Sequence, residues 1–409
     1  MSEFFGRIVL PLLFLFYLAV TAFQLVCWLG IFDRFAHFLA RLPSQPVAHF
    51  PLPDRRTNES QHLNPVNCQL PVANCPLPFP VSVVVCARNE AENLQRHIPL
   101  WLAQEYAGEW ELVVVDDASD DATPAILRSF QQNNPRLRVV RMAEKKSLGK
   151  KAALTQGVAA ARYEQLLLTD GDCAPTGIHW LAHLAKGLAE TPQTEIALGY
   201  APLVPAPGLL NSWARFETAY TALQYLAFAH VRIPYMGVGR NMAWKRSLFR
   251  QAGGFVRHAD VPSGDDDLLV NAVAQPGRVA LCLDPASFVY SAAKTTWGGW
   301  FRQKQRQLGS SLRYRWWHQL VLGAVAATHT LHYLAALLLL LAFYHPVLML
   351  SVWLLRLGVV LLVWRRVFRG FQERDLLAWV PLHDILLSIY YAGFVPFTFL
   401  RGRKGVRWK

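Results

Sequence analysis

The sequence predicts an α/β domain, with helices on both faces of its sheet, that lies between N-terminal and C-terminal transmembrane helices. Short β-rich apolar runs alternate with helical patterns through the middle of the chain, which is typical of α/β domains. Long uncharged apolar segments lie near both ends. The length of 409 residues exceeds one average domain of about 100 to 200 residues, so a second structural part is expected.

Composition excludes several classes of protein. Of the residues, 53% are hydrophobic and only 17% are charged, which excludes an intrinsically disordered chain. The six cysteines are too sparse and too irregularly spaced for a disulfide scaffold or a metal site. Residues 293–409 contain 16 basic and 3 acidic residues and therefore carry the whole net charge of +13. A basic excess beside apolar segments indicates cytoplasmic membrane flanks, and we expect no nucleic-acid partner.

Residues 1–42 are expected to form an N-terminal transmembrane anchor. The uncharged run at 8–31 is long enough to cross ~30 Å of hydrocarbon as a helix. A cleaved signal peptide is the alternative, but its apolar region would span only ~7 to 15 residues, and residues 26–29 are a poor cleavage site. Residues 43–80 contain nine prolines and are expected to form a semi-extended linker.

Residues 81–296 are expected to form the α/β domain. Alternating short strands and helices favour a parallel sheet covered on both faces. In such sheets ligands bind beyond the carboxyl ends of the strands. The predicted strands are residues 81–87, 111–115, 137–140, 165–169 and 196–200, and the predicted helices are residues 89–104, 123–132, 150–161 and 177–190.

Charged side chains follow three of the predicted strands: Arg88 and Glu90 after the first, Asp116 and Asp117 after the second, and Asp170 and Asp172 after the fourth. Carboxylates gathered at neighbouring strand ends repel one another unless a cation joins them. The pattern therefore predicts Mg²⁺ or Mn²⁺ bridging a diphosphate, because both ions prefer oxygen ligands. An ordinary surface turn rich in Asp and Gly is the alternative. The spacings of a P-loop, an EF-hand and a dinucleotide fingerprint are all missing from the sequence.

Residues 320–409 are expected to form a C-terminal transmembrane and interfacial segment, with spans at 320–343 and 346–364. Arg356 interrupts the second span, which is costly unless it faces protein or a polar cavity. We expect a structural pairing for it, with contact to a lipid substrate as the alternative. The basic flanks predict a multi-pass protein of the inner (plasma) membrane with residues 33–319 in the cytoplasm. The stretch at 376–400 is expected to lie in the interface or re-enter, which leaves the C-terminus cytoplasmic.

Seven motifs follow one another in a specific order: VSVVVCARNE at 81–90, VVVDDASDD at 113–121, SLGKKAAL at 147–154, TDGD at 169–172, a Gly-rich loop at 237–242, SGDDDL at 263–268 and QKQR at 303–306. Together they resemble the membrane-bound, inverting glycosyltransferases of family 2, and the resemblance covers about residues 80–320. It implies the GT-A fold, a Rossmann-like mixed sheet with helices on both faces. It also implies a nucleotide-sugar donor, with UDP as the expected nucleotide.

The resemblance assigns the nucleoside of the donor to the first two strand ends. Asp117, together with Asp116 and Glu90, would accept hydrogen bonds from the uracil and ribose. Arg88 would be a further donor contact.

The diphosphate is assigned to the third and fourth motifs. Lys150 or Lys151, at a helix start, would meet the diphosphate, because the ammonium group and the helix dipole both favour negative charge. Asp170 and Asp172 would hold Mg²⁺ or Mn²⁺, with Asp170 also contributing to donor binding.

The last two motifs are assigned to the acceptor side. Asp265 would take the proton of the acceptor hydroxyl; the alternative for Asp265 is an ordinary N-cap of a helix predicted at 266–274. Gln303 and Arg306, three residues apart on one helical face, would contact the pyrophosphate and the acceptor. Gln307 stands where the family has Trp, which weakens the case for a processive enzyme, whereas Gly264, where many relatives have Glu, should leave the base intact.

The resulting hypothesis is an inverting glycosyltransferase that moves a sugar from a nucleotide-sugar donor to a hydroxyl of a membrane-associated, lipid-linked or glycan acceptor. A processive polysaccharide synthase and a catalytically silent sugar-nucleotide-binding scaffold are the alternatives. Residues 209–233 and 297–319 are amphipathic and are expected to lie on the bilayer, with burial in the core as the alternative for the first.

Overall fold

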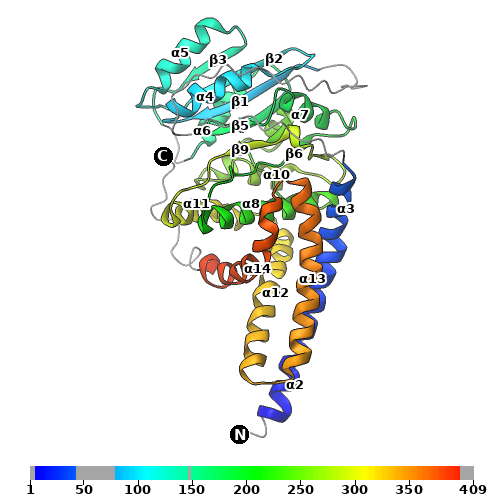
Figure 1. Cartoon of the computed structure of the whole chain (residues 1–409). Helices are drawn as coiled ribbons and strands as arrows, with labels where there is room; N and C mark the ends of the chain where they lie inside the picture. The colour runs from blue at the N-terminus through cyan, green and yellow to red at the C-terminus, as the bar shows by residue number, and fades with distance from the viewer. Residues whose placement is uncertain (1–4, 43–78, 146–148, 397–409) are drawn as a thin grey trace.

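The computed structural model describes residues 5–42, 79–145 and 149–396. In it, the α/β domain lies at one end of a bundle of long helices (Figure 1). The predicted linker up to residue 78, residues 146–148 of the third motif and the basic tail from residue 397 lie outside the described residues.

The domain is built on a seven-stranded mixed sheet, as the resemblance implied. The strand order is β3-β2-β1-β4-β7-β6-β8. β1 pairs in parallel with β2 and β4, whereas β7 runs antiparallel to β4 and β6. A second, two-stranded sheet joins β5 and β9. The strands are β1 Val81–Ala87, β2 Trp110–Asp116, β3 Leu137–Arg141, β4 Gln165–Asp170, β5 Cys173–Pro175, β6 Ile196–Gly199, β7 Met242–Lys245, β8 Val279–Cys282 and β9 Val289–Ser291.

Helices cover both faces of this sheet, so its central strands are buried on both sides. Alternate residues of β1 show this: Val83 and Val85 pack with the side chains of α4, α5 and α7, whereas Val84 and Cys86 pack with those of α6 and α8. A strand buried on both faces is apolar at every position instead of alternating. The helices of the domain are α4 Ala91–Leu102, α5 Thr123–Asn133, α6 Lys151–Ala160, α7 Trp180–Leu188, α8 Leu209–His230, α9 Arg246–Gln251, α10 Asp267–Val273 and α11 Trp297–Ser311, with short 3₁₀ turns η3 Val256–His258 and η4 Pro285–Ser287.

The membrane part is a bundle of long apolar helices. Its first helix is a continuous rod made of η1 Phe5–Val9, α2 Leu10–Cys27, η2 Trp28–Phe32 and α3 Asp33–Arg41. This rod packs against α12 Trp316–Leu341 through α2 and against α13 Pro346–Gly370 through α3. Four helical segments among the described residues are long and apolar enough to cross a membrane: 7–41, 316–341, 346–370 and 374–394. The chain is therefore a membrane protein.

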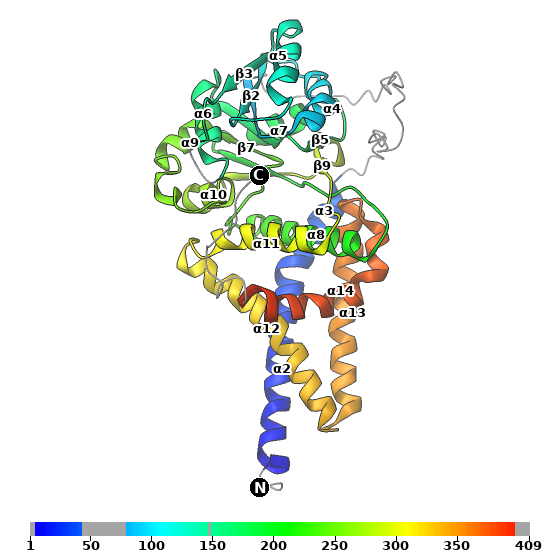
Figure 2. The same ribbon diagram turned by 90° about the vertical axis from the view of Figure 1, so that its left-hand side faces the viewer.

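The fourth of these segments differs from the others in its direction. It consists of η5 Arg374–Trp379, α14 Val380–Ile389 and η6 Tyr390–Phe394. From α14 onward it passes across α12, beneath α8 and α11, instead of continuing along the bundle (Figure 2). A segment that lies in the interface or re-enters the membrane must run across the bundle in this way. That this segment does not cross the membrane stays a prediction.

The two stretches that the sequence placed on the bilayer take different positions. In α8, 16 of the 22 residues are buried, so the core-packing alternative is correct for this helix. The predicted helix at 297–319 is interrupted, because α11 ends at Ser311 and α12 begins at Trp316. The extended backbone of Arg315, with ψ of 137°, separates the two helices. Trp297 and Phe301 of α11 are exposed, as an interfacial helix requires.

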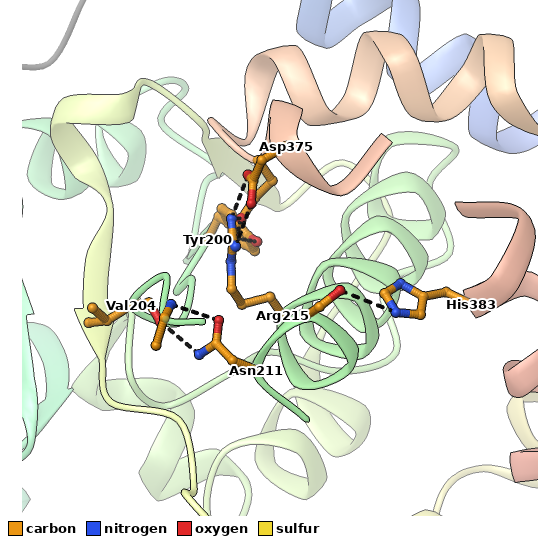
Figure 3. A network of polar contacts seen from close by, with 9 residues as sticks. Tyr200, Val204, Asn211, Arg215, Asp375 and His383 are labelled. Carbon is orange, nitrogen blue, oxygen red and sulfur yellow. Dashed lines mark hydrogen bonds and ion pairs between the residues drawn. The ribbon is translucent and has the colours of Figure 1, made fainter. Parts of the chain in front are cut away.

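A polar network fastens α8 to the C-terminal membrane segment (Figure 3). Arg215 of α8 donates from Nη1 and Nη2 to the two carboxylate oxygens of Asp375, at 2.6 and 2.7 Å, and from Nε to Glu373 at 2.9 Å. Ser212 Oγ lies 3.3 Å from Nε2 of His383 in α14. Bidentate arginine–carboxylate pairs fix orientation as well as distance. The α/β domain is thus held against the bundle in one geometry.

Arg356 is completely buried in the bundle and has polar partners on three other helices. Its guanidinium lies 2.5 Å from Asp384 of α14, donates to Gln24 of α2 at 2.6 Å and lies 3.2 Å from Nδ1 of His329 of α12. A charge in hydrocarbon is tolerated when it is paired inside the protein. These contacts give Arg356 the structural pairing that the sequence analysis favoured.

We predict that Asp384→Asn strongly destabilises the protein in detergent, because it leaves the Arg356 charge buried without its counter-ion. Breaking a buried pair by removing one partner costs about 3–5 kcal/mol. Asp260→Asn is the matched control, since Asp260 pairs with Arg313 at the surface and exposed pairs contribute about 0–1 kcal/mol. Equal melting temperatures for the two variants would contradict the structural role of Arg356.

Candidate functional site

The carboxyl ends of three neighbouring strands place the predicted donor residues at one edge of the sheet. In the β1–β2 register Ala87 faces Asp116, and in the β1–β4 register Cys86 faces Asp170. The loops that follow these strands therefore start side by side. This edge is where ligands bind in open α/β sheets.

Both acidic residues that end β2 are buried. Asp116 accepts a hydrogen bond from the Ser119 backbone N–H at 3.0 Å through Oδ1, and its Oδ2 lies 3.7 Å from Nε of Arg141. Asp117 forms an ion pair with Lys145, and its carbonyl accepts a hydrogen bond from Arg88 Nη1 at 3.0 Å. The side chain of Arg88, in the first motif, thus holds the backbone of the second motif at Asp117.

Glu90 lies between these strand ends and the Asp170–Asp172 turn. It is half-buried, and burial raises the pKa of its carboxyl group, with Asp172 and Asp170 contributing in the same direction. At Gly171, an added Cβ would lie 3.5 Å from Cγ of Glu90. Glu90 therefore faces the same space as the candidate metal ligands.

Asp170 and Asp172 form a candidate cation site. One ligand atom from each of Asp170, Asp172 and Cys173 lies within 4.8 Å of the others. The two carboxylates fit Mg²⁺ or Mn²⁺, which prefer oxygen ligands, whereas the buried thiol of Cys173 does not. The thiol lies 3.4 Å from Oδ1 of Asp172 and supports that side chain. The side-chain chemistry thus fits the predicted ion.

Lys150 connects this cation site with the proposed base. Its ammonium group lies 2.7 Å from Oδ1 of Asp170 and 2.9 Å from Oδ2 of Asp265. Burial alone would lower the pKa of Lys150, but the two carboxylates outweigh it and raise this pKa well above its usual value. Burial likewise opposes ionisation of Asp170, and Lys150 outweighs it and lowers the pKa of that carboxyl. Lys150 and Asp170 therefore stabilise each other in the charged form, and the Asp265 carboxyl group lies beside the same ammonium group.

The structure separates the two lysines that the sequence could not distinguish. Lys151 is buried and donates to the backbone carbonyls of His258 and Val261, at 2.6 and 2.7 Å. It holds the loop before α10 in place and points away from Asp170. Of the two alternatives for the diphosphate, Lys150 is the one whose ammonium group lies in the acidic cluster.

The three consecutive aspartates at the start of α10 have different partners. The helix begins at Asp267, one residue later than predicted, and its N-cap is Asp266, which accepts from the backbone N–H of Asp267 at 2.8 Å and of Gly239 at 2.7 Å. Asp267 accepts from Ser310 and Tyr314 of the α11 end, at 2.5 and 2.6 Å. The capping role belongs to Asp266, so the alternative explanation for Asp265 is wrong.

Burial dominates the titration of Asp266. Burial raises its pKa to about 7, and the neighbouring Asp265 and Asp267 add to the shift. Burial likewise raises the pKa of Asp267, and Asp265 adds to that shift.

Arg306 and Gln303 lie on α11, half-buried. Arg306 is close enough to lower the pKa of Asp170, and its backbone carbonyl accepts from Ser263 Oγ at 2.7 Å. Gln303 lies one turn earlier on the same helix. The α11 motif is thus packed against the loop that carries Asp265.

Two basic residues near the site were not predicted from the sequence. Lys145 pairs with Asp117, and Arg240 lowers the pKa of Asp170 while donating to Ser291 Oγ at 2.6 Å. Arg240 lies inside the Gly-rich loop at 237–242, so its position in that motif was a usable signal. Lys145 precedes the third motif by two residues and carried no comparable signal.

Comparison with known proteins gives consistent family matches. The model described as glycosyl transferase family 2 matches residues 82–245, and the model described as glycosyl transferase family group 2 matches residues 179–395. The second match alone covers more than half of the chain.

Curated relatives match over part of their length. Glycosyltransferase AglE of Haloferax volcanii is 36% identical over 100 residues, which are 24% of this chain and 32% of the relative. The beta-monoglucosyldiacylglycerol synthase of Synechocystis is 28% identical over 218 residues, 51% of this chain and 43% of the relative. The chain thus spans less than half the length of these two relatives.

A solved structure shares the fold. The mannosyltransferase of Pyrobaculum calidifontis, in complex with GDP-Man and Mn²⁺, superposes with a TM-score of 0.54 at 20% identity, and the match covers 92% of this chain and 99% of that chain.

We predict that Gly264→Ala costs more stability than Gly277→Ala. Both glycines have positive φ, +90° and +79°, which costs an alanine roughly 1–2 kcal/mol. At Gly264 the new Cβ would also lie 2.4 Å from Cδ1 of Leu268, whereas at Gly277 nothing lies within 4 Å. Overpacking adds about 1–3 kcal/mol. Chemical denaturation of both variants measures the difference, and equal losses would show that the turn before Asp265 is loosely packed.

Proposed function

The chain belongs to glycosyl transferase family 2 and is a glycosyltransferase, and from this premise we propose that it moves a sugar, with inversion, from a nucleotide-sugar donor to a hydroxyl of a membrane-associated acceptor. One observation carries the proposal. Lys150 lies between Asp170 and Asp265, so a candidate cation ligand and a candidate base from distant parts of the sequence share one ammonium group.

The donor site would lie at the carboxyl ends of β1, β2 and β4. Lys150 pairs with Asp170, and the guanidinium groups of Arg240 and Arg306 also lower the pKa of Asp170; these three cations would offset the charge of a diphosphate. The solved mannosyltransferase with the same fold was determined with GDP-Man and Mn²⁺, which supports a nucleotide sugar and a divalent ion. UDP remains the expected nucleotide.

The divalent ion, Mg²⁺ or Mn²⁺, would be held by Asp170 and Asp172. When bound, it would neutralise charge on the leaving diphosphate. The buried thiol of Cys173 contacts the carboxylate of Asp172. Glu90 lies beside this pair, within the proposed donor site.

Asp265 would act on the acceptor. Its carboxylate takes the proton of the acceptor hydroxyl as the hydroxyl oxygen forms a bond to the anomeric carbon of the sugar. The bond from that carbon to the diphosphate oxygen breaks, and the nucleoside diphosphate leaves with the electron pair. Attack from the face opposite the leaving group inverts the anomeric centre. The side chains of Asp266 and Asp267, which accept hydrogen bonds from Gly239 and Tyr314, fix the backbone next to Asp265.

The membrane part supports a membrane-associated acceptor in the cytoplasmic leaflet. The basic ends of α3 and α13 both lie beside the α/β domain (Figure 1), where Arg366 pairs with Asp33 at 2.6 Å. Because basic residues favour the cytoplasmic side, we place residues 81–296 as the cytoplasmic catalytic domain, 297–319 at the interface and 320–409 in or on the inner membrane. The relative named as a beta-monoglucosyldiacylglycerol synthase supports a lipid acceptor.

We predict that Asp265→Asn lowers the rate of sugar transfer by about 10²–10⁴-fold, since a positioned base contributes that much. Donor binding, measured by thermal stabilisation with nucleotide sugar, should persist. Asp260→Asn, five residues earlier and at the surface, is the control and should retain transfer. If Asp265→Asn transferred sugar at a rate near that of Asp260→Asn, Asp265 would be excluded as the base. If the wild type bound the donor normally but transferred no sugar, the silent-scaffold alternative would be favoured.

We predict that thermal stabilisation by a nucleotide sugar depends on Mn²⁺ or Mg²⁺ and is lost in EDTA, because a ligand that binds only the folded state stabilises it. Asp172→Asn should abolish the metal-dependent part. Asp120→Asn, exposed at the same edge of the sheet, should leave it unchanged. Equal stabilisation with and without EDTA would speak against the cation site.

A further inference from the structure

A cavity of about 400 Å³ connects the surroundings of Asp265 with the membrane helices. Its upper end is formed by Val238, Gly264 and Asp266, and its lower end by Gly323 of α12 and Tyr391 of η6. The cavity is also lined by residues of α8 and α11, the two helices that lie between the sheet and the bundle (Figure 2).

We propose that this cavity binds the acceptor and that the acceptor is an electrically neutral lipid with a free hydroxyl group. The inference rests on the proposed function and specifies its acceptor. Gly264 and Asp266, which line the cavity, are the chain neighbours of Asp265. A lipid head group at this end would contact the residues on either side of Asp265, while its chain would continue between the apolar membrane helices.

A polar stripe on the buried helix α8 supports the binding of a hydroxylated head group. Glu217, Thr221 and Gln224 line the cavity at positions i, i+4 and i+7 of the helix, which share one helical face. Glu217 pairs with Lys304 of α11 and accepts from Thr221 Oγ1 at 3.4 Å. Buried polar groups are costly unless hydrogen-bonded, and a ligand with hydroxyl groups supplies both donors and acceptors to such a stripe.

The charges of the wall argue for a neutral head group. The residues that line the cavity include three carboxyl groups, Glu217, Asp266 and Asp267, and two cations, Arg240 and Lys304. Lys304 is paired with Glu217, and Arg240 donates to Ser291 at 2.6 Å. A phosphate on the acceptor would bring a further negative charge beside Asp266 and Asp267, where burial and the neighbouring carboxyl groups already oppose ionisation. Like charges in a poorly solvated space repel strongly, so a lipid phosphate is disfavoured.

The end of the cavity between the membrane helices is apolar, as a site for a lipid chain requires. It is lined by Leu322, Gly323 and Ala326 of α12 and by Leu387 of α14. Small residues on α12 leave room beside the helix, and an added Cβ at Gly323 would meet nothing within 4 Å. A larger side chain at Gly323 therefore fills space without displacing a packed neighbour.

Gly323→Phe and Gly358→Phe are a matched pair of variants for the test. Both glycines are exposed positions in membrane helices with open space around an added Cβ, but Gly358 of α13 does not line the cavity. The full chain is reconstituted in vesicles that contain either diacylglycerol or a polyprenyl phosphate, together with a labelled nucleotide sugar and Mn²⁺. Transfer to each lipid and thermal stabilisation by the donor are measured in parallel.

We expect label in diacylglycerol and not in the polyprenyl phosphate. Gly323→Phe should reduce this transfer at least tenfold, chiefly by raising the apparent KM for the lipid, with donor stabilisation unchanged, and Gly358→Phe should behave as the wild type. Label in the polyprenyl phosphate would overturn the neutral head group, and full transfer by Gly323→Phe would overturn the cavity as the lipid site. If the nucleotide sugar did not raise the melting temperature of the wild type, the proposed function itself would be contradicted.

Discussion

Crowding of carboxylates at one edge of the sheet is the constraint on which the site depends. Side chains that repel one another stay together only when each has a cation or hydrogen-bond donors. Lys145 neutralises Asp117, and Lys150 is shared by Asp170 and Asp265. The space around Asp170 is therefore already arranged for positive charge. Under the proposed function, a donor with its divalent ion would replace the present cationic contacts of Asp170 with new ones.

Helix α8 links this edge of the sheet to the membrane. Its apolar side chains belong to the same core cluster as those of the sheet and of α13, so the domain and the bundle share one packed interior. Arg215 fixes the start of the helix to η5 through Glu373 and Asp375 (Figure 3). On another face, Glu217 and Lys304 join α8 to α11 inside the cavity. A shared core of this kind makes the distance from the loop of Asp265 to the apolar membrane helices a fixed property of the fold.

Several features were predictable because they depend on local pattern. The strands β1, β2 and β4 each contain a run of at least three consecutive apolar residues, and the charged residues at and after their ends mark the candidate ligand-binding edge. Strands of four residues give little periodicity; the antiparallel β7 was missed, although the equally short β6 was predicted. The single helix predicted at 297–319 was wrong, because the mixture of apolar and basic residues continues through the break at 312–315. Amphipathicity alone could not distinguish a buried α8 from an interfacial one.

The α/β class, the membrane segments and the candidate site residues could be predicted from the sequence, because apolar periodicity and motif order are properties of neighbouring residues. The tertiary structure was needed to distinguish neighbouring residues of the same type. Lys150 pairs with Asp170 and Asp265, whereas Lys151 holds a loop. Asp266 caps α10, whereas Asp265 does not. The physical reason is that charge pairing and burial depend on residues brought together from far apart in the chain. A one-residue difference along a helix turns a side chain by about 100°, which the sequence pattern does not resolve.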